Sequence, residues 1–137
     1  MRDSPETSEQ KAFFQWICLN KRLRHCIFSI PNEAKRSILE CQRLKSMGLR
    51  PGVSDLFIAY PTSVYHGLFI EMKAKKKGSN NYNKPTSEQL LFCDDMWTQG
   101  YAAVICNGSD MAINVTQMYL NDMDFCKYRK WPYNISF

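Results

Sequence analysis

The feature that most constrains the fold of this chain is a pair of apolar runs of strand length, separated by a short turn. The runs are residues 55–60 (DLFIAY) and 66–73 (HGLFIEMK), and residues 61–63 (PTS) begin the segment between them. Apolar runs of this length on either side of a turn signal predict a β-hairpin. A bend centred near Ser63 pairs Asp55 with Glu71, with their Cβ atoms about 5 Å apart.

The predicted hairpin carries its charges on one face. Side chains alternate along a strand, so Glu71 and Lys73 share one face, and the other face is apolar and must be buried: Leu68, Ile70 and Met72. Opposed carboxylates destabilise a strand pair unless a cation lies between them. An isolated E-x-K motif is also typical of an exposed charge pair. The sharp turn at Pro51 and Gly52, directly before Asp55, and the matching lengths of the two runs favour a metal site.

Several motifs appear in order along the chain: residues 48–57 (GLRPGVSDLF), 67–73 (GLFIEMK), 87–89 (SEQ) and 100–101 (GY). In this order and spacing they resemble the VRR-NUC domain, the virus-type replication-repair branch of the PD-(D/E)XK nucleases. The resemblance covers roughly residues 9–120. One departure is Ser54, where the family often has Pro before the catalytic Asp. Serine lacks the fixed φ of proline, so the approach to the Asp is expected to be less rigid.

The fold class expected from both the pattern and the resemblance is α/β. The resemblance implies a mixed-sheet, restriction-endonuclease-like core flanked by helices. At 137 residues the chain fits one domain. We expect a nuclease domain over residues 1–120 and an aromatic, basic extension over 121–137 that packs on the same domain or on a dimer partner. Hydrophobic periodicity predicts helices and strands in the order α-β-α-β-β-α-β-α, over residues 7–20, 25–30, 38–47, 55–60, 66–73, 86–99, 101–106 and 109–120.

The resemblance implies a ligand set for a divalent ion. Asp55 and Glu71 would bind Mg²⁺ or Mn²⁺, which prefer oxygen ligands, and the backbone carbonyl of Met72 would complete the set. Lys73 would orient the attacking water or stabilise charge in the transition state. No zinc motif is present, and the six cysteines, which include no C-x-x-C pair, are expected to be buried free thiols.

Two further residues have competing interpretations. In the family, a Glu of the first helix lies beside the metal; Glu9 matches it best, and Glu6 is the less favoured candidate. Such an acid near a helix start could instead serve the helix dipole. Gln89 matches a Gln that points at the site, but it also forms a capping-box pattern with Thr86. One side chain is not expected to fill both roles, and the active-site role is favoured.

The charge of the chain favours an anionic partner. The formal net charge is +5, which fits nucleic acid better than a membrane. Polar and basic residues in two segments near the predicted site could contact phosphates, or could form an ordinary solvated surface: Asn32, Lys35 and Arg36 in one, and Lys75, Lys76, Lys77 and Lys84 in the other.

The function expected from these features is a metal-dependent DNA endonuclease. Some family members act as homodimers on branched DNA, which suggests a four-way-junction resolvase with symmetric sites. The alternatives are a catalytically silent DNA-binding module of the same fold, and a basic domain that binds another protein through its aromatic tail. The sequence has no transmembrane run and no signal-peptide pattern, so a cytoplasmic location is expected.

Overall fold

The computed structural model describes residues 2–31 and 36–133 of the chain, and it confirms the α/β class and the predicted order of elements. The elements are α1 (Pro5–Ile17), β1 (Ile27–Ser29), α2 (Ile38–Ser46), β2 (Leu56–Ile58), β3 (Leu68–Lys73), α3 (Ser87–Thr98), β4 (Ala102–Asn107), α4 (Gly108–Leu120) and a short 3₁₀ turn, η1 (Cys126–Tyr128).

The strands form one mixed sheet in the order β1-β2-β3-β4. The first three strands pair antiparallel, and β3 pairs with β4 in parallel through the α3 crossover. In the hairpin, Leu56 lies opposite Ile70 and Ile58 lies opposite Leu68. The predicted register is therefore confirmed, and Asp55 precedes β2 at the position across from Glu71.

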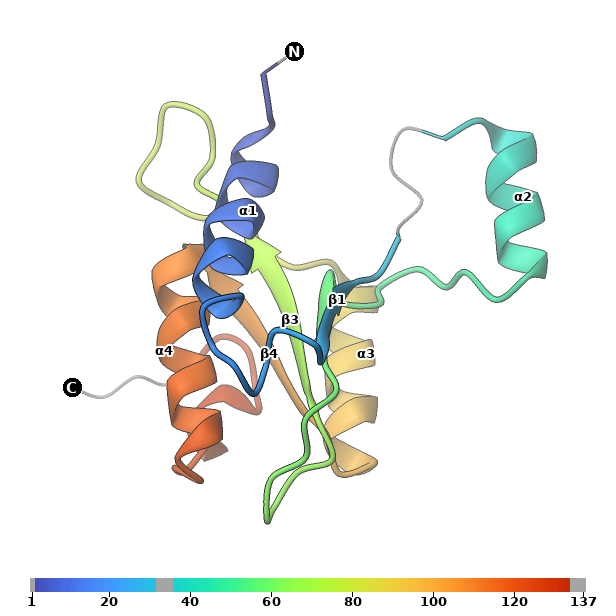
Figure 1. Ribbon diagram of the computed structural model, residues 1–137. Coiled ribbons are helices and arrows are strands. Elements are labelled where there is room, and N and C mark those ends of the chain that lie inside the picture. Colours follow the sequence, from blue (N-terminus) through green and yellow to red (C-terminus); the bar gives the residue numbers. More distant parts are fainter. Residues whose placement is uncertain (1, 32–35, 134–137) are drawn as a thin grey trace.

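Helices cover both faces of the sheet (Figure 1). Helices α1 and α4 lie on one face and α3 lies on the other, whereas α2 stands apart from the body of the molecule. The three residues predicted on the apolar side of β3 are fully buried: Leu68, Ile70 and Met72. Burying side chains of this size contributes roughly 1.5–3 kcal/mol each, so this layer holds the hairpin in its register.

The predicted extent of the first helix is wrong at its C-terminal end. Helix α1 stops at Ile17, and the Asn20 side chain accepts hydrogen bonds from the backbone N–H groups of Arg22 and Leu23. Leu19 therefore lies beyond the helix and is 82% exposed. Leu23 is buried in the core, and it reaches the core from the turn rather than from the helix.

The segment after α4 lies against β4, the last strand of the sheet. Phe125 and Tyr128 are buried, and the Tyr133 hydroxyl accepts from Ile105 N and donates to Ile105 O, each at 2.8 Å. These bonds satisfy backbone groups on an otherwise unpaired strand edge. The division of the chain at residue 120 stays a prediction.

All six cysteines lie in the described part of the chain and are free thiols. Only Cys93 and Cys106 are buried, three others are half-buried and Cys126 is exposed, so the expectation of burial holds for a minority. None of the helices described has both the length and the apolar character needed to cross a membrane.

Candidate metal centre

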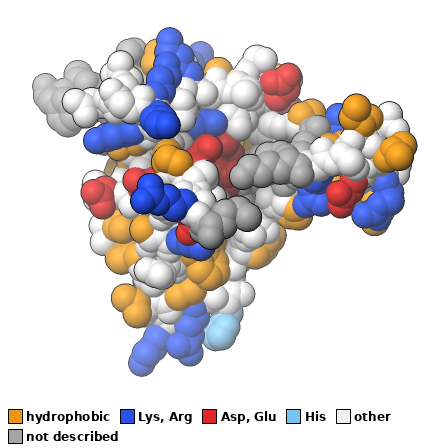
Figure 2. All heavy atoms as spheres, turned by 90° about the horizontal axis from the view of Figure 1, so that it is seen from above, with side chains coloured by type: hydrophobic (Ala, Val, Ile, Leu, Met, Phe, Trp, Pro, Cys, Tyr) orange, Lys and Arg blue, Asp and Glu red, His pale blue; other side chains and the backbone are white. Residues whose placement is uncertain are grey.

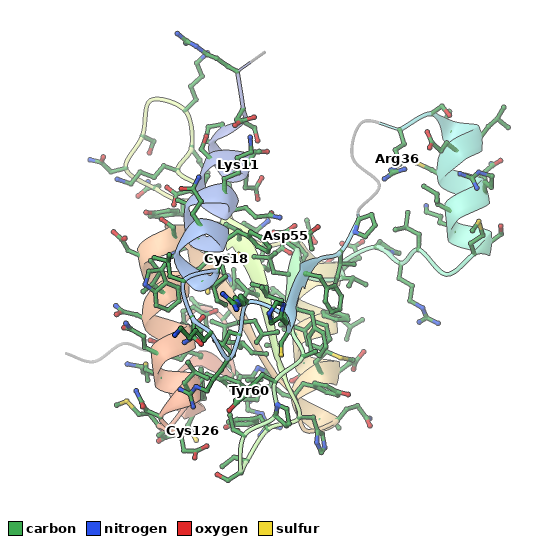
Figure 3. The ribbon with its side chains drawn as sticks, viewed as in Figure 1. Lys11, Cys18, Arg36, Asp55, Tyr60 and Cys126 are labelled. Atoms are coloured by element: carbon green, nitrogen blue, oxygen red, sulfur yellow. The ribbon has the colours of Figure 1, made fainter. Side chains whose placement is uncertain are left out.

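Three carboxylates meet at one end of the sheet, where β2 starts and β3 ends. Asp55 stands at the head of β2 beside α1 (Figure 3), Glu71 comes from β3, and Glu6 comes from the first turn of α1. One oxygen of each carboxylate lies within 4.8 Å of the others. Asp55 is held in place because its Oδ2 accepts a hydrogen bond from Met72 N at 2.8 Å. The predicted convergence of strand residues thus occurs in the structure, with a third acid added by the helix.

Glu71 is the most buried of the three acids. Its side chain is 4% exposed, and its Oε2 has no hydrogen-bond partner among the described residues. Burial, and then the nearby Asp55, raise the pKa of Glu71 to about 8. Burial also raises the pKa of Asp55 and of Glu6. Without a cation, the fold therefore disfavours full ionisation of the cluster.

Lys73 is the positive group built into the site. It is almost fully buried, and its Nζ lies 3.4 Å from Glu71 Oε1 and 3.9 Å from Glu6 Oε1. Lys73 lowers the pKa of Glu71, but the burial of the carboxyl outweighs this effect. One amine is therefore too little positive charge for three acids, and an unpaired buried oxygen remains. Carboxylate oxygens that lack enough positive charge nearby are suitable ligands for a hard divalent cation, so the site can hold such an ion.

Gln89 caps α3 and also reaches the acid cluster, two contacts that were treated as exclusive. Its Oε1 accepts from Thr86 N at 3.0 Å, and Thr86 Oγ1 accepts from Gln89 N, which completes the capping box of α3. Its Nε2 donates to Glu71 Oε1 at 2.7 Å. The expectation that one role excludes the other is wrong, because a carboxamide has an acceptor end and a donor end. The cap thus fixes the amide that orients Glu71.

We expect Gln89→Ala to affect both ends of this link. Loss of the hydrogen bond that Gln89 accepts from Thr86 N should lower the free energy of unfolding by about 1 kcal/mol. Loss of the donor to Glu71 should also weaken Mn²⁺ binding, by roughly tenfold, as is usual for a residue that orients a metal ligand. Thermal unfolding and calorimetric titration measure the two effects. Thr86→Ala serves as a control for the cap, and equal Mn²⁺ affinity in wild type and Gln89→Ala would contradict the orienting role.

Glu9, the acid favoured by sequence, contacts a different part of the molecule. Its Oε2 accepts from Ser109 N at 2.6 Å, at the start of α4. Asn107 is the N-cap residue but makes no side-chain capping bond. A carboxylate from α1 therefore takes the place of a local side-chain cap on α4. Glu6, one turn earlier in α1, is the acid that joins the cluster.

Separate substitutions should distinguish these two acids. Glu9→Ala leaves a backbone N–H at the α4 start unpaired and should cost about 1 kcal/mol, a fall of a few degrees in Tm, with Mn²⁺ binding unchanged. Glu6→Ala removes a half-exposed side chain and should weaken Mn²⁺ binding with little change in Tm. Calorimetry and thermal unfolding of both variants provide the measurements. The reverse pattern would assign the metal role to Glu9.

The loop that leads into Asp55 is fixed by packing rather than by a proline. Gly52 has φ +86°, and a Cβ atom there would lie 2.5 Å from the backbone of Glu88. Ser54 is 1% exposed, so its side chain is enclosed. The approach to Asp55 is therefore tied to the first turn of α3, the same turn that places Gln89.

A cleft opens over the carboxylates. It is lined by the start of α1, by the loop before β2 and by the start of α3, and it includes Pro31 and Arg50 at its rim. Figure 2, which looks down on this end of the molecule, shows acidic side chains at the centre of the face and basic side chains beside them. The cleft is open to solvent, so a polymer could reach the acids.

Of the residues predicted to bind DNA, those that the structure describes lie in two segments. The lysine loop (residues 74–85) follows Lys73 directly and is ordered as a small hairpin, with Lys75 paired to Tyr82 across it. Arg36 lies just before α2 and pairs with Glu40 at 3.3 Å (Figure 3). Asn32 and Lys35 fall outside the described residues. No ligand contact tests these assignments, so they stay predictions.

Comparison with known proteins finds a solved structure that shares this fold. A solved structure described as a VRR_NUC domain protein matches the chain with a TM-score of 0.74 and 28% sequence identity, over 95% of this chain and 99% of the other. The predicted resemblance and fold class are therefore confirmed. No protein-family model and no curated protein matches the chain.

Proposed function

We propose that this chain, which has the fold of the VRR-NUC nucleases, is a metal-dependent endonuclease that hydrolyses phosphodiester bonds in DNA. The observation that carries the proposal is the convergence of Glu6, Asp55 and Glu71 within 4.8 Å, with the Lys73 amine 3.4 Å from Glu71. Burying a carboxyl oxygen that has no hydrogen-bond partner costs free energy of folding. A function that uses the acids therefore explains their placement better than a contribution to the stability of the fold does.

Asp55 and Glu71 would hold the ion, with Glu6 as a third carboxylate and the Met72 carbonyl as a further candidate ligand. Mg²⁺ and Mn²⁺ suit this all-oxygen set. A bound divalent ion would polarise the scissile phosphate and lower the pKa of a bound water. The hydrogen bond from Met72 N holds one Asp55 oxygen toward β3. Asp55 would therefore need no rearrangement to serve as a ligand.

Lys73 and Gln89 would act beside the ion. Lys73 is buried against two of the acids, so its ammonium can face the non-bridging oxygens of a phosphate, or a water, without a search through rotamers. Gln89 holds Glu71 Oε1 and leaves Oε2 without a partner among the described residues. Glu71 would therefore offer Oε2 to the ion while its other oxygen is fixed.

The finer proposal is a preference for branched DNA, cut by a homodimer with two symmetric sites. It is supported by the resemblance and by the basic segments around the cleft. Cleavage of labelled four-way junction, flap and plain duplex in Mg²⁺ or Mn²⁺ tests it. The junction should be cut faster than the duplex; equal rates would remove the branch preference, and no cutting of any substrate in either metal would remove the nuclease assignment.

A further inference from the structure

The segment of residues 36–50, which we call the α2 arm, has no role in the fold that the structure reveals. Figure 1 shows α2 projecting away from the sheet and its covering helices, and no residue of α2 is buried. A helix of nine residues is too short to be stable in water by itself, and a segment with no fully buried residue adds little to the core. Its sequence is therefore better explained by what it contacts outside the chain.

The arm is basic. It carries four positive residues and one negative, Glu40, for a net charge of +3 out of +5 for the whole chain: Arg36, Arg43, Lys45 and Arg50. In the last turn of α2, Arg43 and Lys45 also suit the helix dipole. A dipole effect does not account for the position of the arm, nor for Arg36 and Arg50, which lie outside the helix.

The arm is attached at the rim of the acidic cleft. Pro31, the last described residue before it, and Arg50, where it returns, both line the cleft. The lysine loop emerges from the same site, because Ala74 directly follows Lys73. In Figure 1 the arm and the lysine loop lie to opposite sides of α1 and of the strand ends that carry the acids. Two basic projections therefore flank one acidic centre.

From this arrangement we propose that the α2 arm binds the phosphate backbone of duplex DNA on the side of the scissile phosphate opposite to the lysine loop. The inference rests on the proposed nuclease function and extends it: the substrate continues on both sides of the cut, which favours internal cleavage over removal of end nucleotides. Basic side chains on a projecting element can contact phosphates without reading bases.

A second copy of the chain is the other possible occupant of the arm, because Ile38, Leu39 and Met47 are exposed. Packing two arms about a two-fold axis would bring two segments of net charge +3 together, which like-charge repulsion opposes. Phosphates instead complement this charge. Exposed apolar side chains among basic ones are also compatible with DNA contact.

The test measures binding without cleavage. Fluorescence anisotropy of the full-length protein with a labelled duplex of about 30 base pairs, in EDTA, gives Kd across a salt series. The double variant Arg43→Ala/Lys45→Ala should lose two phosphate contacts. It should bind the duplex several-fold more weakly, and the magnitude of the slope of log binding constant against log salt concentration should fall by about 1.8. Alanine is the best helix former, so the double variant should keep the helix.

Two matched variants serve as controls. Lys21→Ala/Arg24→Ala removes two exposed charges that follow the C-terminal end of α1, whereas Glu6 lies at its N-terminal end. This variant should leave the slope unchanged. Arg43→Lys/Lys45→Arg keeps the charges and should bind like wild type. An unchanged slope in the alanine variant overturns the role of the arm, even if the wild type cuts DNA in Mn²⁺.

Two other results would also overturn the inference, and they distinguish failure of the arm proposal alone from failure of the proposed nuclease function. If the arm variant binds like wild type and Leu39→Asp converts a dimer into a monomer in sedimentation, the arm is a contact between copies. If the wild type neither binds nor cuts DNA, the proposed nuclease function fails together with the arm.

Discussion

Lys73→Met should reduce DNA cleavage by about 10²–10³-fold while the protein still binds Mn²⁺. The expected loss is that of one preorganised charge facing a transition state. Methionine matches the length of the lysine stem, so it fills the buried space without an amine. Removing a cation that lies 3.4 Å from Glu71 should not weaken the attraction of the acids for a divalent ion. The substitution therefore separates chemistry from metal binding.

Single-turnover cleavage and calorimetric titration with Mn²⁺ measure the two quantities. Lys21→Met is the matched control, because Lys21 is exposed and lies past the end of α1 remote from the acids. Cleavage by Lys73→Met at the wild-type rate would show that the site is wrongly assigned. Loss of Mn²⁺ binding in step with cleavage would instead show that Lys73 maintains the site rather than acting in the reaction.

The part of the site that comes from the hairpin was predictable because local rules determine it. The turn near Ser63 and the alternation of β3 set the register, and the register places Asp55 across from Glu71. A one-residue slip would have turned Leu68 and Ile70 away from the core and Glu71 away from Asp55. Burial of the apolar side of β3 thus fixes the register that places Glu71 across from Asp55.

The contribution of α1 depended on tertiary position, which periodicity does not give. Glu6 and Glu9 lie seven and four residues before the buried Phe13, so both point toward the sheet side of the helix. Only the position of α1 along its axis, set by packing on α4 and β3, decides which turn reaches the carboxylate cluster and which reaches Ser109. The spacing from Glu6 to Phe13 was the available signal, but it did not separate the two.

Gln89 was misjudged for a different reason. The capping box is present and the amide also reaches Glu71, but the two contacts were weighed as alternatives. The structure uses the oxygen for the cap and the nitrogen for Glu71. A local motif can therefore be the means by which a functional side chain is held, and the presence of one role is no argument against the other.

The second large effect concerns stability against pH. Glu71 has a pKa of about 8 in the fold, against an ordinary value of 4.5. Between these values the folded chain holds a proton that the unfolded chain has lost, so the metal-free protein should lose stability as pH rises from about 4.5 to 8. The raised pKa values of Asp55 and Glu6 act in the same direction. Thermal unfolding in EDTA across this range measures the effect.

Glu71→Gln isolates the contribution of this residue, because glutamine is neutral at every pH. The variant should show a flatter dependence of Tm on pH and should be more stable than metal-free wild type at pH 8. A metal-free wild type whose Tm does not fall over this range would contradict the buried, raised-pKa state of Glu71.

Added Mn²⁺ should reverse the trend in the wild type, because metal and proton compete for the same oxygens. At a free concentration 100 times Kd, a bound ligand stabilises the fold by about 2.7 kcal/mol, and this gain should be largest near pH 8 and shrink toward pH 5. Glu71→Gln should show little of it at any pH. A gain equal in both proteins, or independent of pH, would mean that the ion binds elsewhere. The acids at the head of the hairpin would then be a cost to the fold with no ligand to offset it.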